Sequence, residues 1–162
     1  MFIYSVRAST LKLFAIICLC LTVLVTISAL DSNTAVYASV GGRTVSYGGI
    51  KTEEDRVKFI EGFGLQVSGE PTECEEFTMP EDLDRALLAY NELQKMQGLD
   101  ISKYTRKRVT HYAYEITNYD YEGKVYVNLL IYRGRVIACD LSSGDPEGFV
   151  LPLSGIEEGK IK

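Results

Sequence analysis

Residues 80–104, PEDLDRALLAYNELQKMQGLDISKY, predict one long amphipathic helix with a defined start and stop. Pro80 suits the first turn of a helix, where a missing N–H costs no hydrogen bond. Three of the next four residues are acidic and favour the positive end of the helix dipole. Gly98 suits a left-handed C-terminal cap, over which Leu99 can close. A rotation of about 100° per residue predicts a core-facing stripe of Leu83, Ala86, Leu87, Tyr90, Leu93, Gln94 and Gln97.

Several polar side chains lie in or beside this stripe, and buried polar groups need hydrogen-bond partners. We therefore expect them to hold the helix to neighbouring backbone and loops rather than to bind a ligand. The residues with this expected structural role are Tyr90, Asn91, Gln94, Gln97 and Asp100.

The same segment resembles domain-of-unknown-function family 4830. The resemblance extends from about Thr52 to Leu153, with Leu65 where an aromatic residue is expected and Ala138-Cys139 where glycines are expected. It implies a small bacterial protein, mainly from Firmicutes, that is often membrane-anchored or exported, and it transfers no catalytic or binding residues. The matching residues are Tyr90-Asn91, Leu93-Gln94, residues 97–102, Tyr104, Gly62-Phe63-Gly64 and Thr78-Met79-Pro80.

The N-terminus predicts a membrane segment. Residues 13–30 carry no charge and are just long enough to cross the hydrocarbon of a bilayer. Arg7 and Lys12 precede this segment, so residues 1–12 are expected in the cytoplasm and the remainder outside the cell. A cleaved signal peptide, cut after residues 36–38, is the alternative to a retained anchor. Either way, the domain is expected to be extracytoplasmic.

Charge limits the function classes. Residues 31–162 carry 22 acidic and 15 basic side chains, a net charge of −7. This balance argues against a dedicated nucleic-acid binder and against a protein that binds anionic lipid surfaces. An acidic run over residues 70–84 favours a solvated face over a calcium loop, because the spaced ligands and turning glycine are missing. The nearby cations Lys103, Arg106, Lys107 and Arg108 are expected to pair with that run, with binding of an anionic wall polymer or phosphate as the alternative.

The remaining chain predicts an α+β fold, with two helices packed on a mainly antiparallel sheet. Residues 31–50 are rich in Gly, Ser and Thr and predict a flexible spacer. Thr52 caps a first helix that ends at Gly62, and short strands are expected at residues 65–67 and 74–79. Period-two patterns then predict a three-stranded meander over residues 108–141. The domain should span residues 51–153, followed by a disordered tail at 154–162.

Candidate chemistry is sparse. His111 is the sole histidine, which excludes a His-rich zinc site, and neither catalytic nor metal-ligating residues nor a cofactor are predicted. One alternative is a hydrolase or thiol enzyme in which His111 activates Cys139, with Asp140 nearby. Cys139 is expected to be packed in the core instead, or bonded to Cys74, since both a disulfide and two separate thiols fit the sequence.

Tyrosine is the other conspicuous feature, with eleven residues, many of them in the predicted sheet. Tyrosine is a good strand residue, yet a tyrosine-rich face can also bind peptides or sugars. The candidate ligand-binding residues are Tyr112, Tyr114, Tyr126 and Tyr132. The favoured function is a non-enzymatic module that binds an envelope protein or polymer. Besides the enzyme, an inhibitor or regulator of a membrane enzyme is the alternative.

Overall fold

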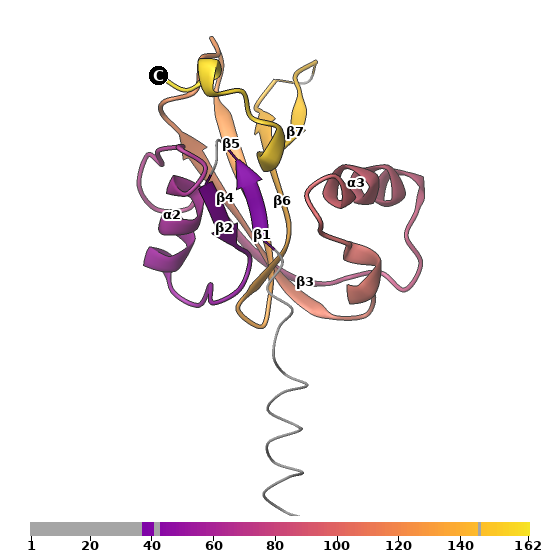
Figure 1. The fold of residues 1–162 in the computed structure, drawn as a ribbon. Helices are drawn as coiled ribbons and strands as arrows, with labels where there is room; N and C mark the ends of the chain where they lie inside the picture. The colour runs from indigo at the N-terminus through magenta and orange to yellow at the C-terminus, as the bar shows by residue number, and fades with distance from the viewer. Residues whose placement is uncertain (1–36, 41–42, 146) are drawn as a thin grey trace, which may run out of the picture. The chain divides into compact units, whose positions relative to one another are not determined.

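The computed structural model describes residues 37–40, 43–145 and 147–162 (Figure 1). The predicted cytoplasmic segment 1–12 and membrane segment 13–30 lie outside the described residues. Within the described ranges, no helix combines the length and the apolarity that a membrane span requires.

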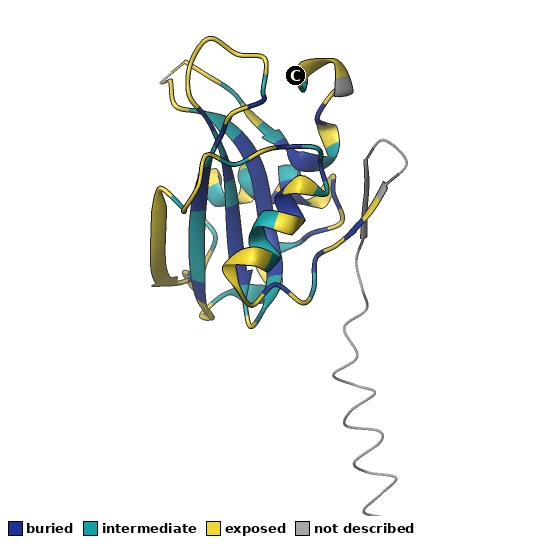
Figure 2. Cartoon of the chain, turned by 90° about the vertical axis from the view of Figure 1, so that its left-hand side faces the viewer, coloured by how far each residue is buried: buried dark blue, intermediate teal, exposed yellow. Residues whose placement is uncertain are grey.

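A five-stranded antiparallel sheet forms the centre of the domain, with its strands in chain order. The predicted meander supplies the three middle strands, and two more strands extend it, one on each side. The strands are β3 (Glu73–Thr78), β4 (Arg108–Ile116), β5 (Val125–Tyr132), β6 (Arg135–Ser143) and β7 (Val150–Pro152). Figure 2 shows buried residues along the central strands and exposed residues on the edge strand β3. β5 is central and mostly buried, as its apolar pattern on both faces predicts.

Two helices pack on opposite faces of this sheet: α2 (Glu53–Glu61) and α3 (Arg85–Lys95). Thr52 caps α2 as predicted, and its side chain forms a capping box with Asp55. The larger core lies on the α2 face and includes Phe59, Ile60 and the inward side chains of β5. The smaller core lies on the α3 face, with Met79, Val109 and Ile101 among its members. The α+β prediction is therefore confirmed.

Helix α3 begins later than its sequence predicts. Asp84, not Pro80, is the N-cap, and its side chain accepts a hydrogen bond from the Leu87 N–H at 2.8 Å. Extended pairing continues past β3, because the Met79 backbone bonds to both Lys107 and Arg106. The helical turn can form only after that pairing ends. The stop is as predicted: Gly98 has φ +78°, and the Leu99 N–H bonds the Gln94 carbonyl at 3.1 Å.

The predicted spacer and tail both belong in part to the packed domain. β1 (Tyr37–Val40) pairs with β2 (Arg43–Ser46), and Tyr47 and Ile50 are buried in the α2-side core. The Tyr47 hydroxyl donates to the Gln97 carbonyl at 3.0 Å. The compact domain therefore begins before residue 51, because these side chains belong to the α2-side core.

The C-terminal residues are also ordered, so the predicted disordered tail is wrong. They form two 3-10 turns, η2 (Leu153–Gly155) and η3 (Glu158–Lys160). Ile156 is 6% exposed and joins the α2-side core, while the Lys162 N–H donates to the Asn118 carbonyl. Residues 65–67 give only an isolated bridge, Val67 to Ile116, instead of the short strand that their sequence predicts.

Candidate functional site

A pocket of about 240 Å³ opens on the α3 face of the sheet, and we call it the α3 pocket. Its wall is apolar and comes from β3, the turn after it, α3, the 3-10 turn η1 (Ile101–Tyr104) and β5. The apolar residues are Phe77, Met79, Pro80, Leu87, Ile101 and Leu130, and the polar residues are Tyr90, His111, Asn128 and Asp140. An apolar pocket with a few converging polar groups is the usual form of a small-ligand site.

Strand register brings the polar groups together. Asn128 on β5 lies opposite Asp140 on β6, and His111 on β4 lies opposite Leu130 on β5. Directly opposed residues of antiparallel strands share a face, and residues two apart on one strand do as well. All three polar side chains therefore lie on the face that α3 covers, where Tyr90 reaches them from the helix.

Asp140 is the centre of a hydrogen-bond network. The Tyr90 hydroxyl donates to Oδ1 of Asp140 at 2.6 Å, and Nδ2 of Asn128 donates to Oδ2 at 2.8 Å. The same Asn128 nitrogen lies 2.9 Å from Oγ of Ser142. Both carboxylate oxygens thus have a donor, which is what a buried carboxylate requires.

The network also fixes the tautomer of His111. Because Nδ2 of Asn128 faces Asp140, its Oδ1 is the atom directed at Nε2 of His111, 3.3 Å away. An amide oxygen only accepts, so Nε2 carries the proton when the ring is neutral. Nδ1 then faces Glu73, whose Oε1 is 3.9 Å distant. Protonation of Nδ1 would give this pair opposite charges.

Burial dominates the electrostatics of the pocket floor. Asp140 is 4% exposed, and desolvation raises its pKa above the usual 3.8, against the opposing effects of the Tyr90 and Asn128 hydrogen bonds. Burial and the neighbouring Asp140 raise the pKa of Tyr90 well above 10. Tyr90 is therefore a neutral donor at physiological pH.

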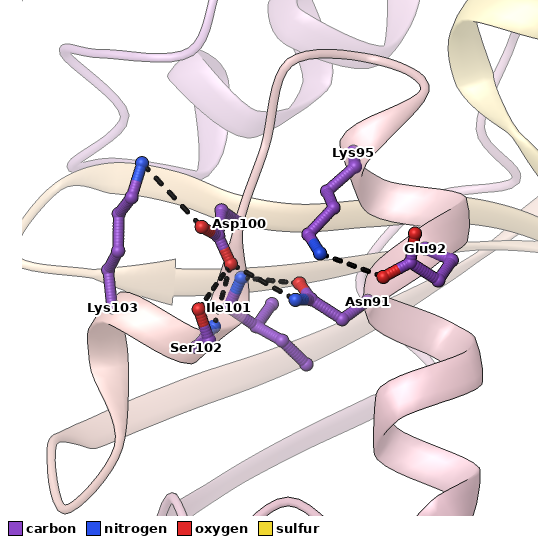
Figure 3. A network of polar contacts seen from close by, with 7 residues as sticks. All are labelled: Asn91, Glu92, Lys95, Asp100, Ile101, Ser102 and Lys103. Atoms are coloured by element: carbon purple, nitrogen blue, oxygen red, sulfur yellow. Dashed lines mark hydrogen bonds and ion pairs between the residues drawn. The ribbon is translucent and has the colours of Figure 1, made fainter.

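A second network fixes the segment that follows α3 (Figure 3). Nδ2 of Asn91 donates to Asp100 at 3.0 Å, and Oδ1 of Asn91 accepts the backbone N–H of Ile101 at 2.8 Å. Ser102 donates to the same Asp100 oxygen through its hydroxyl, at 2.6 Å, and through its backbone N–H. The pKa of Asp100 is lowered to about 2, and the hydrogen bond from the Ser102 hydroxyl is the largest cause. This network holds Ile101 in the pocket wall.

Two glutamines hold α3 to the sheet. The Cys139 backbone N–H donates to Oε1 of Gln94 at 2.9 Å, and Nε2 of Gln97 donates to the Cys139 carbonyl at 2.5 Å. Nε2 of Gln97 also bonds Oε1 of Gln94. The pairing of β6 with β7 stops at Asp140, so these side-chain amides take the place of a strand beside Cys139. Among the described atoms, Nε2 of Gln94 is buried without a partner.

The predicted stripe of α3 is thus only partly apolar in its contacts. Gln94 and Gln97 are its buried members, and Asn91 beside it is buried too, whereas Ala86 is exposed and Leu83 and Leu93 are half-buried. The five polar residues with a predicted structural role all form the hydrogen bonds described above.

Cys74 and Cys139 are free thiols, so the possible Cys74–Cys139 disulfide does not form. Three strand spacings separate β3 from β6, about 14 Å. A disulfide needs Cα atoms within about 7 Å.

Cys139 also lies opposite Leu129, on the α2 face, whereas His111 faces α3. The thiol–imidazole pair is therefore not assembled, and complete burial raises the pKa of the Cys139 thiol well above 9.

The four candidate tyrosines do not form one surface. Tyr114 is fully buried on the α2 face and accepts a hydrogen bond from Arg56, while Tyr112 on the same face lies under the Arg56 guanidinium. Tyr126 and Tyr132 are half-buried on the other face. A shared tyrosine platform is therefore ruled out by sheet geometry.

The charged runs pair as predicted in part: Arg106 with Glu81, and Arg108 with Glu76 at 2.6 Å. The described ranges hold no group of three or more residues suited to a metal ion. Among the four polar residues of the pocket, Asn128 is the one that the sequence did not single out. Its signal is a lone amide in the otherwise apolar and aromatic strand VYVNLLIY.

Comparison with known proteins gives a family but no function. The family model described as domain of unknown function (DUF4830) matches residues 59–141. All residues that line the α3 pocket fall within that span. No curated protein and no solved structure matches significantly. Since the matched span exceeds half of the 162 residues, the protein belongs to the DUF4830 family.

Proposed function

We propose that the protein is a non-enzymatic binding module of the cell envelope, and that the α3 pocket is its binding site. The observation that carries this proposal is the composition of the pocket: six apolar residues form the wall, and four polar residues converge on its floor. The ligand would be a small apolar molecule, or the apolar end of an envelope polymer or exported protein, with one polar group directed toward Asp140 or His111.

The arrangement of the floor favours binding over turnover. Both oxygens of Asp140 already accept hydrogen bonds, while Nε2 of His111 is directed at Asn128 and Nδ1 faces Glu73. General-base catalysis needs a group that is free to take a proton from the substrate, and nucleophilic catalysis needs an activated nucleophile. None of the pocket-lining residues is a serine, threonine, cysteine or lysine.

A pair of tryptophan variants tests the binding site. Leu87 lines the pocket, whereas Leu88 is 52% exposed on the same helix and does not. Leu87→Trp should fill the pocket and weaken binding of a neutral apolar dye such as Nile red by at least about tenfold. Leu88→Trp adds the same ring outside the pocket and should leave binding within about twofold. Equal dye affinity in both variants would contradict the proposal.

We also propose that residues 13–30 tether the domain to the membrane with its N-terminus inside, or direct its secretion if they are cleaved. The uncharged segment and the basic residues before it support this placement. Exposed Cys74 provides the test. A membrane-impermeant maleimide should label the full-length chain in intact cells, and Cys74→Ser should abolish the label. Labelling that appears only after lysis would place the domain in the cytoplasm.

A further inference from the structure

We propose a second binding site, for a phosphate group, on the α2 side of the sheet. It is a depression of about 320 Å³, and it does not depend on the α3 pocket. Its cationic residues are Lys51, Arg56, Arg108 and Arg133, and Glu76 is the only carboxylate among the described residues that line it. These cations come from four separate parts of the described fold: the segment before α2, α2 itself, β4 and the β5–β6 turn.

Arg56 is the cation of this site that is held by two tyrosines. Its Nε donates to the hydroxyl of Tyr114 at 2.7 Å, and its guanidinium carbon lies 4.0 Å from the ring centroid of Tyr112. Tyr114 is fully buried, so the anchoring hydroxyl is fixed by the core. For the two Nη groups, no hydrogen bond or ion pair occurs among the residues that the structure describes. A guanidinium held in this way offers donors that suit two oxygens of one phosphate.

The β5–β6 turn places two further cations at the rim. Arg133 and Gly134 have φ +48° and +74°, as a two-residue hairpin turn requires. The Lys51 stem lies against this turn: a Cβ on Gly134 would be 3.2 Å from Cγ of Lys51. The backbone also connects here, since the Ile50 N–H donates to the Gly134 carbonyl. Neither the ammonium of Lys51 nor the guanidinium of Arg133 has a carboxylate partner in the described chain.

Charge distinguishes this depression from the rest of the molecule. Glu76 is already shared with Arg108, at 2.6 and 3.0 Å. Glu53 interacts with Arg56 electrostatically but does not line the depression. An excess of cations therefore remains, in a region 31–162 whose net charge is −7. The uncompensated cations repel one another, and a bound dianion would relieve that repulsion.

The ligand class follows from charge and openness. A phosphate monoester carries up to two negative charges and accepts hydrogen bonds at several oxygens. Thr110 and Tyr112 also line the site, and a threonine hydroxyl can donate to a phosphate oxygen. Lys51, Arg108 and Arg133 are exposed, so the phosphate can belong to a larger molecule that remains in solvent. The shared chemistry is the phosphate group, whether on a soluble molecule or a lipid headgroup.

Titration of the full-length protein with inorganic phosphate and glycerol phosphate, at low and high salt, tests the site. Arg56→Gln and Lys51→Gln should each weaken binding by about tenfold, and salt should weaken it in the wild type. Lys107→Gln is the matched control. Lys107 is exposed and precedes Arg108 in the sequence, but it does not line the site. Its affinity should match that of the wild type within about twofold.

Arg56→Lys separates recognition by the guanidinium from simple charge. It keeps the positive charge but loses the forked donors, so its affinity should fall close to that of Arg56→Gln. Thermal unfolding of each variant confirms that the fold is retained. Vesicles of phosphatidic acid, compared with phosphatidylcholine vesicles, identify the source of the phosphate. If the protein binds both glycerol phosphate and phosphatidic acid vesicles, lipid headgroups are among its ligands. If it binds glycerol phosphate alone, the ligand is a soluble molecule. Absence of phosphate binding at millimolar concentration, or equal weakening by Lys107→Gln, would overturn the proposal.

Discussion

Replacement of Asn91 by alanine should be among the most destabilising changes on α3. Asn91 is 2% exposed and uses both ends of its amide, one toward Asp100 and one toward the Ile101 backbone. The variant would leave the buried Ile101 N–H without an acceptor. It would also remove one donor from Asp100, which keeps the two hydrogen bonds from Ser102. Because Ile101 lines the α3 pocket, its wall should loosen at the same time.

The expected cost is about 3 kcal/mol at neutral pH. An unsatisfied buried N–H costs about 1–3 kcal/mol, and a lost hydrogen bond to a charged group adds about 1–2 kcal/mol when a partner remains. Part of this cost depends on pH. The pKa of Asp100 is lowered to about 2, so its stabilising contribution is present above 3.8 and is lost as the pH falls through about 2. Asn91→Ala removes one cause of that lowering, so the stability difference between wild type and variant should narrow in acid to the cost of the unsatisfied Ile101 N–H.

Urea unfolding followed by far-UV circular dichroism measures the difference, as a lower midpoint with an unchanged slope. Thermal unfolding should show a decrease of about 12 °C, at about 4 °C per kcal/mol for a domain of this size. Glu92→Ala is the control, since Glu92 is exposed and, within the described part of the chain, pairs only with Lys95. It should cost less than about 1 kcal/mol. A cost for Asn91→Ala as small as that of the control would refute the structural role of the network.

Four further outcomes are expected. The raised pKa of Asp140 means that ionisation of this carboxyl disfavours the folded state. Its contribution to stability is present below pH 3.8 and falls as the pH rises through the raised pKa. In urea titrations at a series of pH values, Asp140→Asn should therefore gain stability relative to wild type as the pH rises over that range. Deletion of residues 156–162 should cost about 2 kcal/mol or more, because Ile156 is buried; an unchanged urea midpoint would contradict this. Gly98→Ala should cost about 1–2 kcal/mol in the same assay, because φ at this position is +78°. Native Cys139 should resist a maleimide that modifies Cys74 and should react only in urea, as mass spectrometry would show; equal reaction of both thiols would contradict its burial.

Local patterns in the sequence were sufficient for most of the secondary structure. Alternation over residues 108–141 predicts the three central strands, and the Thr52 cap and the Gly98 stop depend on neighbouring residues alone. These features are predictable because propensity, capping and turn geometry act over a few residues. The start of α3 was misplaced for the same reason. Pro80 suits a first turn, but Met79 forms long-range backbone pairs that hold the chain extended.

The site depends on contacts between residues far apart in the chain. His111 and Cys139 lie on opposite faces, while His111, Asn128 and Asp140 share one, because pairing register sets which residues align across strands. The burial of Tyr47 and Ile156 likewise comes from packing on a sheet formed by other segments. Even the docking of α3 through Gln94 and Gln97 requires a β6 edge that β7 leaves uncovered. Sequence periodicity fixes the faces of each element separately, and only the packed fold determines which faces meet.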